Sequence, residues 1–122
     1  MKIYYREKSG GIEILRCFGI ESRVEIPGMI DDKLVISAAP YAFSSHMDEK
    51  EELKNASLWE VSEGLGFGRE EHVLAGNDVE EIVFPYTLKE IGRYIFYGCG
   101  NLKKLEFSDS LMQIGCGAFT GC

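Results

Sequence analysis

The sequence predicts a mainly β fold with short helical turns, arranged as a right-handed β/α solenoid with an N-terminal β-hairpin cap and one inserted helix. Three observations predict it: an ungapped internal repeat, alternating apolar residues within each repeat, and two strand-like segments joined by glycines near the N-terminus. A hydrophobic content of 45% and a charged content of 27% are typical of a globular protein. We expect one domain over residues 1–122. It divides into a cap (1–23), a degenerate repeat (24–43), an acidic helical and loop insert (44–78) and two regular repeats, the last incomplete (79–122).

The cap is predicted from Lys2–Arg6 and Ile12–Arg16, which are strand-like and joined by Lys8-Ser9-Gly10-Gly11. Strands separated by a short glycine-containing turn form a hairpin. A stack of coils must cover its first coil, and we expect this hairpin to do so.

The degenerate repeat is visible in Val24–Pro27 and in Pro40–Phe43, which match Ile82–Pro85 and Arg93–Phe96. The distance from proline to phenylalanine is 43 − 27 = 16 residues in the first unit and 96 − 85 = 11 in the second. The five additional residues, around Gly28–Asp32, are expected to loop out.

The insert begins with Ser45-His46-Met47-Asp48, a pattern that opens helices. A helix is predicted over Asp48–Ala56, with Leu53 and Ala56 facing the core and Trp59 packing on the same side.

The regular repeat is the strongest signal. Ile82–Cys99 aligns with Leu105–Cys122 without a gap, at an offset of 105 − 82 = 23, and seven of eighteen positions are identical. Within each unit, alternating apolar residues predict a short strand. A second apolar residue (Ile91 or Ile114), a glycine and one predicted helical turn follow it. Stacked coils place equivalent strands about 4.8 Å apart, so equivalent side chains form ladders.

The strings LxxLxF, FP…LKEIG, IGCGAF and GC-x-NL resemble the leucine-rich repeat of BspA-like (TpLRR-type) bacterial proteins. The resemblance covers residues 79–122 and, less closely, 24–43. It implies a leucine-rich-repeat solenoid in a bacterial protein that acts by binding other proteins.

The net charge of −7 is concentrated in residues 44–81, where eleven acids face three bases. Phosphate backbones would be repelled there, so we expect no nucleic-acid partner. The acidic stretch is either a solvated face or a docking surface for a basic partner. No apolar run is long enough to span a bilayer, so no membrane insertion is expected. The first residues lack the layout of a secretory signal, which predicts a cytoplasmic location, or a surface or secreted one if the chain is part of a longer protein.

Four cysteines occur, at positions 17, 99, 116 and 122. Cys99 and Cys122 are one repeat apart and could approach within bridging distance, but free buried thiols are the expected state without a secretory signal. The spacings match no zinc motif, and Cys116 is the expected exposed thiol.

No catalytic residue, cofactor or metal site is predicted. A Cys–His nucleophile is disfavoured because His46 and His72 lie in the insert. Gly64–Arg69 lacks the strand-before-helix context of a phosphate-binding loop. His46 with Asp48, and Glu70-Glu71-His72, are predicted to be surface residues rather than metal ligands.

Two surfaces are candidates for protein binding. Outward residues of the repeat strands are either a partner-binding strip or simply solvated: Glu81, Val83, Lys104, Glu106 and Ser108. The sequence stops within a repeat, which predicts a longer natural chain, stacking of two chains end to end through Leu111, Ile114 and Phe119, or local fraying.

The leading hypothesis is therefore a non-enzymatic protein–protein interaction module whose partner the sequence does not identify. The alternative is a structural or assembly unit that stacks end to end, as a homo-oligomer, through its C-terminal repeat.

Overall fold

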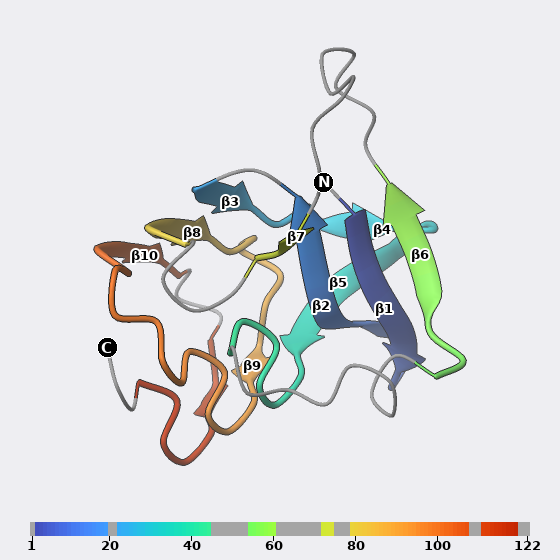
Figure 1. The fold of residues 1–122 in the computed structure, drawn as a ribbon. Helices are drawn as coiled ribbons and strands as arrows, with labels where there is room; N and C mark the ends of the chain where they lie inside the picture. Colours follow the sequence, from blue (N-terminus) through green and yellow to red (C-terminus); the bar gives the residue numbers. More distant parts are fainter. Residues whose placement is uncertain are drawn as a thin grey trace.

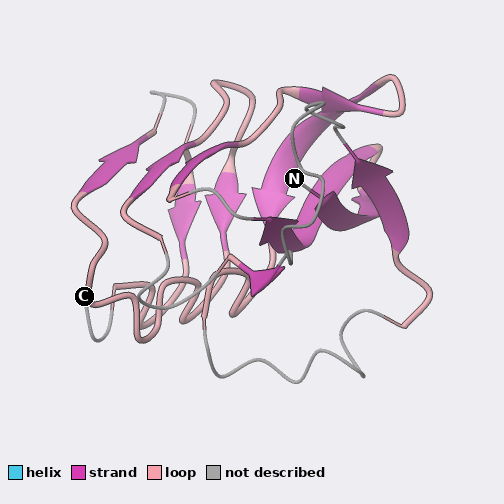
Figure 2. Cartoon of the chain, turned by 45° about the horizontal axis from the view of Figure 1, so that its top comes forward, coloured by secondary structure: helices cyan, strands magenta, loops and turns pink. Residues whose placement is uncertain are grey.

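The computed structural model describes residues 2–19, 22–44, 54–60, 72–74, 79–107 and 111–119. Within these ranges the chain consists of strands and turns, and no described segment is helical (Figures 1 and 2). The mainly β character predicted from the sequence is confirmed. The strands are β1 (Lys2–Lys8), β2 (Gly11–Gly19), β3 (Arg23–Glu25), β4 (Met29–Ile30), β5 (Lys33–Ala38), β6 (Ser57–Glu60), β7 (His72–Val73), β8 (Glu81–Val83), β9 (Glu90–Ile91), β10 (Lys104–Glu106) and β11 (Gln113–Ile114).

The N-terminal hairpin is confirmed. Strands β1 and β2 pair antiparallel from Lys2 opposite Phe18 to Lys8 opposite Gly11. The connecting residues Ser9 and Gly10 both have positive φ, 52° and 81°, as a two-residue hairpin turn matched to strand twist requires.

The repeat alignment is also confirmed, because equivalent strands pair in parallel at the predicted offset. Glu81–Val83 of β8 lie opposite Lys104–Glu106 of β10. In a second sheet, Ile91 of β9 lies opposite Ile114 of β11. The sheets have the orders β10-β8-β3 and β11-β9-β5-β2-β1-β6, and Figure 2 shows the arrows of the stacked coils as two rows on the left of the view.

The degenerate unit takes its place at the start of both rows. In the first sheet Val24 of β3 pairs with Ile82, and in the second Ala38 of β5 pairs with Ile91. The predicted five-residue excursion is a small hairpin, in which β4 pairs antiparallel with the start of β5. Its turn residues Asp31 and Asp32 both have positive φ, 52° and 60°.

The N-terminal hairpin of β1 and β2 joins the stack of coils through a parallel pair of strands. Strand β2 pairs with β5, so Ile14 lies opposite Ala38, and the sheet continues from the repeats into β2 and β1. The hairpin therefore occupies the edge of the first coil in this sheet.

The predicted helical turns of the repeats are wrong. Residues 40–43, 93–98 and 116–119 form successive turns, closed by bonds such as Tyr97 N–H to Tyr94 O. The reason is local: Tyr41, Tyr94 and Gly117, each at the same repeat position, have positive φ of 61°, 52° and 69°. A right-handed helical turn cannot include a left-handed residue.

The insert also differs from its prediction. Residues 48–53 of the expected helix, with Leu53, lie outside the described residues, and so does the predicted opening at 45–48. The described end of that helix is a turn, because Asn55 has a positive φ of 66° and Ala56 is irregular. Strand β6 then pairs antiparallel with β1, and Trp59 packs against the core as predicted. Strand β7, which also comes from the insert, pairs with the end of β2.

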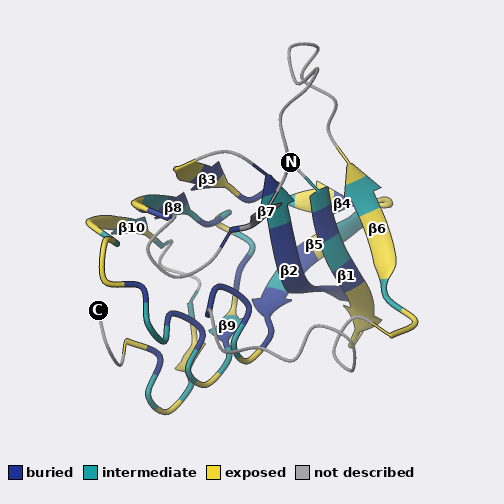
Figure 3. Cartoon of the chain, in the orientation of Figure 1, coloured by how far each residue is buried: buried dark blue, intermediate teal, exposed yellow. Residues whose placement is uncertain are grey.

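The core runs along the stack as ladders of equivalent side chains. Phe43, Phe96 and Phe119 lie one above another, with ring centroids 6.1 and 5.5 Å apart. Figure 3 shows burial highest along β2 and through the first coils, and lower toward β10.

Candidate interaction surfaces

The predicted partner-binding residues of the first sheet do lie together. Lys104 pairs with Glu81, which pairs with Arg23, and in the next row Glu106 pairs with Val83. We call this surface the strand face; it comprises Arg23, Glu25, Glu81, Val83, Lys104 and Glu106. Ser108, the remaining predicted residue, lies outside the described residues.

The charges of the strand face bind one another. Glu81 of β8 forms ion pairs with Arg23 of β3, at 3.3 Å, and with Lys104 of β10, at 3.6 Å. Arg23 also contacts Glu25 at 3.3 Å, and Lys104 contacts Glu106 at 3.4 Å. The pKa of Arg23 is raised, first by Glu25 and then by Glu81. Exposed pairs of this kind contribute little to stability, but they leave few charges unmatched for a charged ligand.

The last coil differs sharply from the coil before it. Ile91 and Phe96 are 2% and 0% exposed, whereas their equivalents Ile114 and Phe119 are 52% and 44% exposed. Leu105, Phe107 and Leu111 are half-buried, while the residues one repeat earlier are buried. We call this the end surface: Leu105, Phe107, Leu111, Met112, Ile114 and Phe119. It includes the three residues predicted for an end-to-end contact.

Met112 was missed, although it is 83% exposed. The repeat offers a signal for it, because Met112 stands where the preceding unit has Lys89, a position that points to solvent. An apolar side chain replaces a charged one at an outward position of the final coil.

The end surface also presents backbone groups. Each coil bonds to the next through Glu80, Lys89 and Ile91 carbonyls, which accept from Lys103, Met112 and Gly115 N–H. The return bonds run from Phe84, Tyr94 and Phe96 N–H to Glu106, Cys116 and Ala118 carbonyls. The equivalent groups one repeat later are the carbonyls of Lys103, Met112 and Ile114 and the N–H groups of Phe107, Gly117 and Phe119. Among the described residues, none of these six groups bonds to a further coil.

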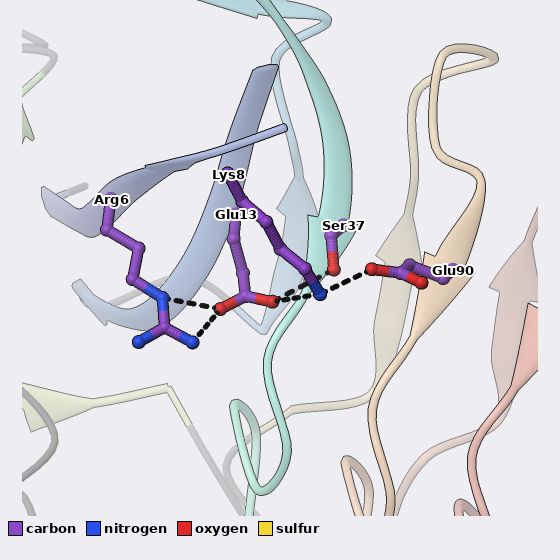
Figure 4. A network of polar contacts seen from close by, with 5 residues as sticks. All are labelled: Arg6, Lys8, Glu13, Ser37 and Glu90. Carbon is purple, nitrogen blue, oxygen red and sulfur yellow. Dashed lines mark hydrogen bonds and ion pairs between the residues drawn. The ribbon is translucent and has the colours of Figure 1, made fainter. Parts of the chain in front are cut away.

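A separate polar cluster joins the hairpin to the stack (Figure 4). Glu13 of β2 is 2% exposed and accepts hydrogen bonds from Arg6 Nε at 2.7 Å, Lys8 Nζ at 3.1 Å and Ser37 Oγ at 3.1 Å. Lys8 also bonds Glu90 of β9, at 2.5 Å. The lysine thus bridges the cap and the second coil.

The Lys8–Glu90 contact changes the titration of both groups. The hydrogen bond from Lys8 lowers the pKa of Glu90 below its usual 4.5. The same bond raises the pKa of Lys8 above 10.5, against the opposing effect of burial. Both shifts follow from stabilising the charged forms of an ion pair.

Arg16 forms a second junction between cap and stack. Its guanidinium is buried and donates to the backbone carbonyls of Tyr41 at 2.7 Å and Ala42 at 3.2 Å. Sequence reasoning missed both Glu13 and Arg16, because alternation within a two-sided strand assigns charged residues to solvent.

Two cationic side chains and the Ser37 hydroxyl hold Glu13, and the Arg16 guanidinium donates to backbone carbonyls. Cys17 and Cys99 are buried cysteines outside any disulfide, as expected, and Cys116 is exposed. Cys122, His46, Gly64–Arg69 and Glu70–Glu71 lie outside the described residues, and of His72 only the backbone is described.

In the described part of the chain, three or more His, Cys, Asp or Glu side chains do not gather as they would around a metal ion. No helix in those residues has the length and apolarity to cross a membrane.

Comparison with known proteins gave one match. Residues 70–122 match the family model described as BspA type Leucine rich repeat region (6 copies). Comparisons with curated proteins and with solved structures found no match. The matched range contains β8 to β11, the strands that pair at the 23-residue offset. The match confirms the resemblance found in the sequence for residues 79–122, and it does not extend to residues 24–43.

Proposed function

We propose that this chain is a non-enzymatic protein-interaction module, formed by the first coils of a right-handed leucine-rich-repeat solenoid, and that its binding surface is the end surface. Leucine-rich repeats of this type suggest protein binding as the general role. The proposal rests mainly on one observation: Ile114 and Phe119 are half-exposed where Ile91 and Phe96, one repeat earlier, are buried.

Burial of such side chains supplies the driving force. Fully burying one large apolar side chain contributes about 1.5–3 kcal/mol. The described chain has seven exposed large hydrophobic residues, and three of them, Met112, Ile114 and Phe119, belong to the last coil. A partner that covers this coil would therefore gain most of its affinity from apolar contact.

The edge also selects the kind of partner. The carbonyls of Lys103, Met112 and Ile114 and the N–H groups of Phe107, Gly117 and Phe119 are spaced to accept a backbone with the shape of another coil. A protein segment that follows the course of the coil can satisfy them, and its strand portions pair as in recognition by strand addition. A small molecule cannot reach all six groups along the coil.

The strand face is the less favoured surface. Its charges already pair with one another, from Glu25 through Arg23, Glu81 and Lys104 to Glu106. A ligand that covers the whole strand face must compete with these contacts for the charged side chains, so charge there favours one register over another more than it adds affinity. The alternative function, a structural unit that assembles with copies of itself, depends on the same exposed coil, because a second copy of the chain could be the partner that covers it.

A peptide tests the end surface directly. Residues 79–101 form one complete coil of this chain, and a synthetic peptide with that sequence would place its Glu81 opposite Lys104, continuing the alternation of charge in Arg23, Glu81 and Lys104. We expect added peptide to slow amide hydrogen exchange at Phe107, Gly117 and Phe119 of the protein. The measurement uses dilute protein, so that chains do not protect one another by association. The exchange rates without peptide are the baseline.

The matched control is the same peptide with Ile82 and Phe84 replaced by serine, which keeps the charges and removes the apolar ladder. The control should give no protection. Equal protection by both peptides, or none from the parent peptide at millimolar concentration, would contradict the proposal.

The non-enzymatic part has its own test. Thiol titration combined with mass spectrometry should label Cys116 at the rate of an ordinary exposed thiol, while Cys17 and Cys99 react only on unfolding. Labelling of Cys116 far faster than that of a free cysteine, or bound metal in the purified protein, would point to catalysis instead.

A further inference from the structure

Among the described strands, β10 ends the first sheet, and a defined set of its backbone groups points away from its neighbour β8. Phe84 N–H donates to Glu106 O at 3.0 Å, and Lys104 N–H donates to Glu80 O at 3.2 Å, so Lys104 and Glu106 face β8. Backbone groups of successive strand residues point to opposite sides. The N–H and C=O of Leu105 and the N–H of Phe107 therefore point outward. So does the C=O of Lys103, the equivalent of the Glu80 carbonyl.

We propose that a second copy of this chain binds this edge, so that two β10 strands pair antiparallel about a two-fold axis at Leu105. The proposal deepens the proposed function, on which it rests, by naming the partner of the end surface. A two-fold interface uses the same surface on both subunits, and that surface must be self-complementary.

The backbone groups are self-complementary in this register. Leu105 lies opposite the partner's Leu105, and the two residues exchange both of their N–H···O=C bonds. Lys103 C=O accepts from the partner's Phe107 N–H, and the symmetric bond forms at the other end. All four outward groups are used.

The charges are self-complementary as well. In the same register Lys104 lies opposite the partner's Glu106, and Glu106 lies opposite the partner's Lys104. These are non-hydrogen-bonded positions, where facing side chains come closest. A shift by two residues in either direction pairs Lys104 with the partner's Lys104 or Glu106 with the partner's Glu106. The charges of β10 therefore select one register.

Apolar contact completes the interface. The two-fold axis brings the two end surfaces against each other, so Leu105 and Phe107, now half-buried, gain a covering layer. Head-to-tail stacking cannot do the same. At the N-terminal side β3 has no second neighbour among the described strands of the first sheet, but β5 is already paired with β2 in the second sheet.

Charge-swapped variants test the register. Sedimentation equilibrium over a range of concentrations should show the molar mass of the parent chain rising to that of a dimer. Lys104→Glu places a glutamate opposite the partner's Glu106, and Glu106→Lys places a lysine opposite the partner's Lys104. Because each repulsion occurs twice in the dimer, we expect either variant alone to dimerise about tenfold or more weakly.

Mixing the two variants restores the pairs. The Lys104→Glu chain carries an acidic side chain at both positions, and the Glu106→Lys chain carries a basic side chain at both. In an equimolar mixture every acidic side chain therefore faces a basic one, so a heterodimer should form where neither variant dimerises alone. The double variant K104E/E106K should dimerise again.

Two controls accompany the variants. Circular dichroism and urea unfolding check that each variant is folded, since Lys104 also contacts Glu81. Lys54→Glu, an equal change of charge at an exposed turn before β6, is the matched control and should dimerise like the parent.

The proposal is overturned if the parent chain stays monomeric at millimolar concentration, or if the folded mixture shows no heterodimer. A monomeric parent whose end surface is still protected by the peptide 79–101 would refute the two-fold pairing and leave the proposed function intact. Loss of both results would overturn both.

Discussion

Phe84 and Phe107 stack almost face to face, with ring centroids 5.3 Å apart and ring planes 7° apart. They stand at the same position of successive repeats, next to the paired strands β8 and β10. This separation is close to the roughly 4.8 Å spacing of paired strands. Moving from one strand to the next in the sheet therefore places each side chain over its equivalent in the preceding repeat, and this spacing is repeated along the stack.

The ladder makes the cost of a truncation depend on the coil. Phe96→Ala removes a fully buried ring between Phe43 and Phe119 and should lower the free energy of unfolding by about 3–5 kcal/mol. Phe119→Ala, one repeat later and 44% exposed, should cost clearly less. Urea denaturation of dilute protein measures both. Glu106→Ala is the control, and we expect it to change stability by about 0.5 kcal/mol at most. Equal losses for the two phenylalanines would mean that the last coil is covered.

The repeat glycines should be intolerant of a methyl group. A Cβ at Gly115 would lie 2.3 Å from Arg93 N of the preceding coil, just as a Cβ at Gly92 would lie 2.3 Å from Pro40 N. Gly115→Ala must push two coils apart, and we expect it to cost about 1–3 kcal/mol. Gly28→Ala is the matched control, because its Cβ would meet only Pro85 Cβ, at 3.7 Å. Thermal unfolding of the two variants should separate them by several degrees, and similar melting temperatures would contradict the close coil contact.

The buried carboxylate should hold the hairpin on the stack. Glu13→Gln removes the charge that Arg6, Lys8 and Ser37 share, and hydrogen bonds to charged groups contribute about 1.5–3 kcal/mol. We expect a loss in that range from chemical denaturation. Glu7→Gln breaks the exposed pair with Lys33 and serves as the comparison, with a clearly smaller expected loss, because exposed ion pairs contribute little to stability. A Glu13→Gln variant as stable as the parent would show that the cluster is not a structural junction.

The Lys8–Glu90 pair predicts a specific dependence of stability on pH. The folded-state pKa of Glu90 is below 4.5, so the pair stabilises the fold above that pH and loses its contribution as pH falls through the lowered value. At the alkaline end the folded-state pKa of Lys8 is above 10.5, so the contribution is complete below 10.5 and is lost as pH rises through the raised value. Both side chains are partly exposed, which limits the effect to about 1 kcal/mol or less.

Glu90→Gln should remove this contribution and flatten the acid limb of a plot of unfolding free energy against pH. Measurements between the acid limit of folding and neutrality are sufficient. An unchanged slope would mean that the contact is not maintained in solution.

The stack could be predicted because its signal is local and repeated. Phe84 and Phe107, or Ile91 and Ile114, occur at a constant offset, and only parallel pairing in register explains apolar residues that recur while their neighbours vary. The hairpin was predictable for a similar reason, since Ser9-Gly10 lies between two alternating strings.

The turns and the insert were less predictable because other contacts determine them. Tyr41 and Tyr94 are ordinary residues in the sequence, but their rings stack 5.5 Å apart while their backbones are left-handed. A single strand-like string such as Ser57–Glu60 carries no signal that it pairs with β1. Glu13 alternates with isoleucines and so suggests a solvated side chain, until Ser37 and Lys8 arrive from other elements.

By itself, the sequence determined the stacking: apolar and glycine residues at a constant offset can be buried together in only one parallel register. Tertiary structure alone decided where the charges lie, because Glu13 and Arg16 are buried by strands and turns that are distant in the chain. It also decided which apolar residues remain exposed, since Phe96 and Phe119 occupy equivalent repeat positions and differ only in whether a described coil covers them.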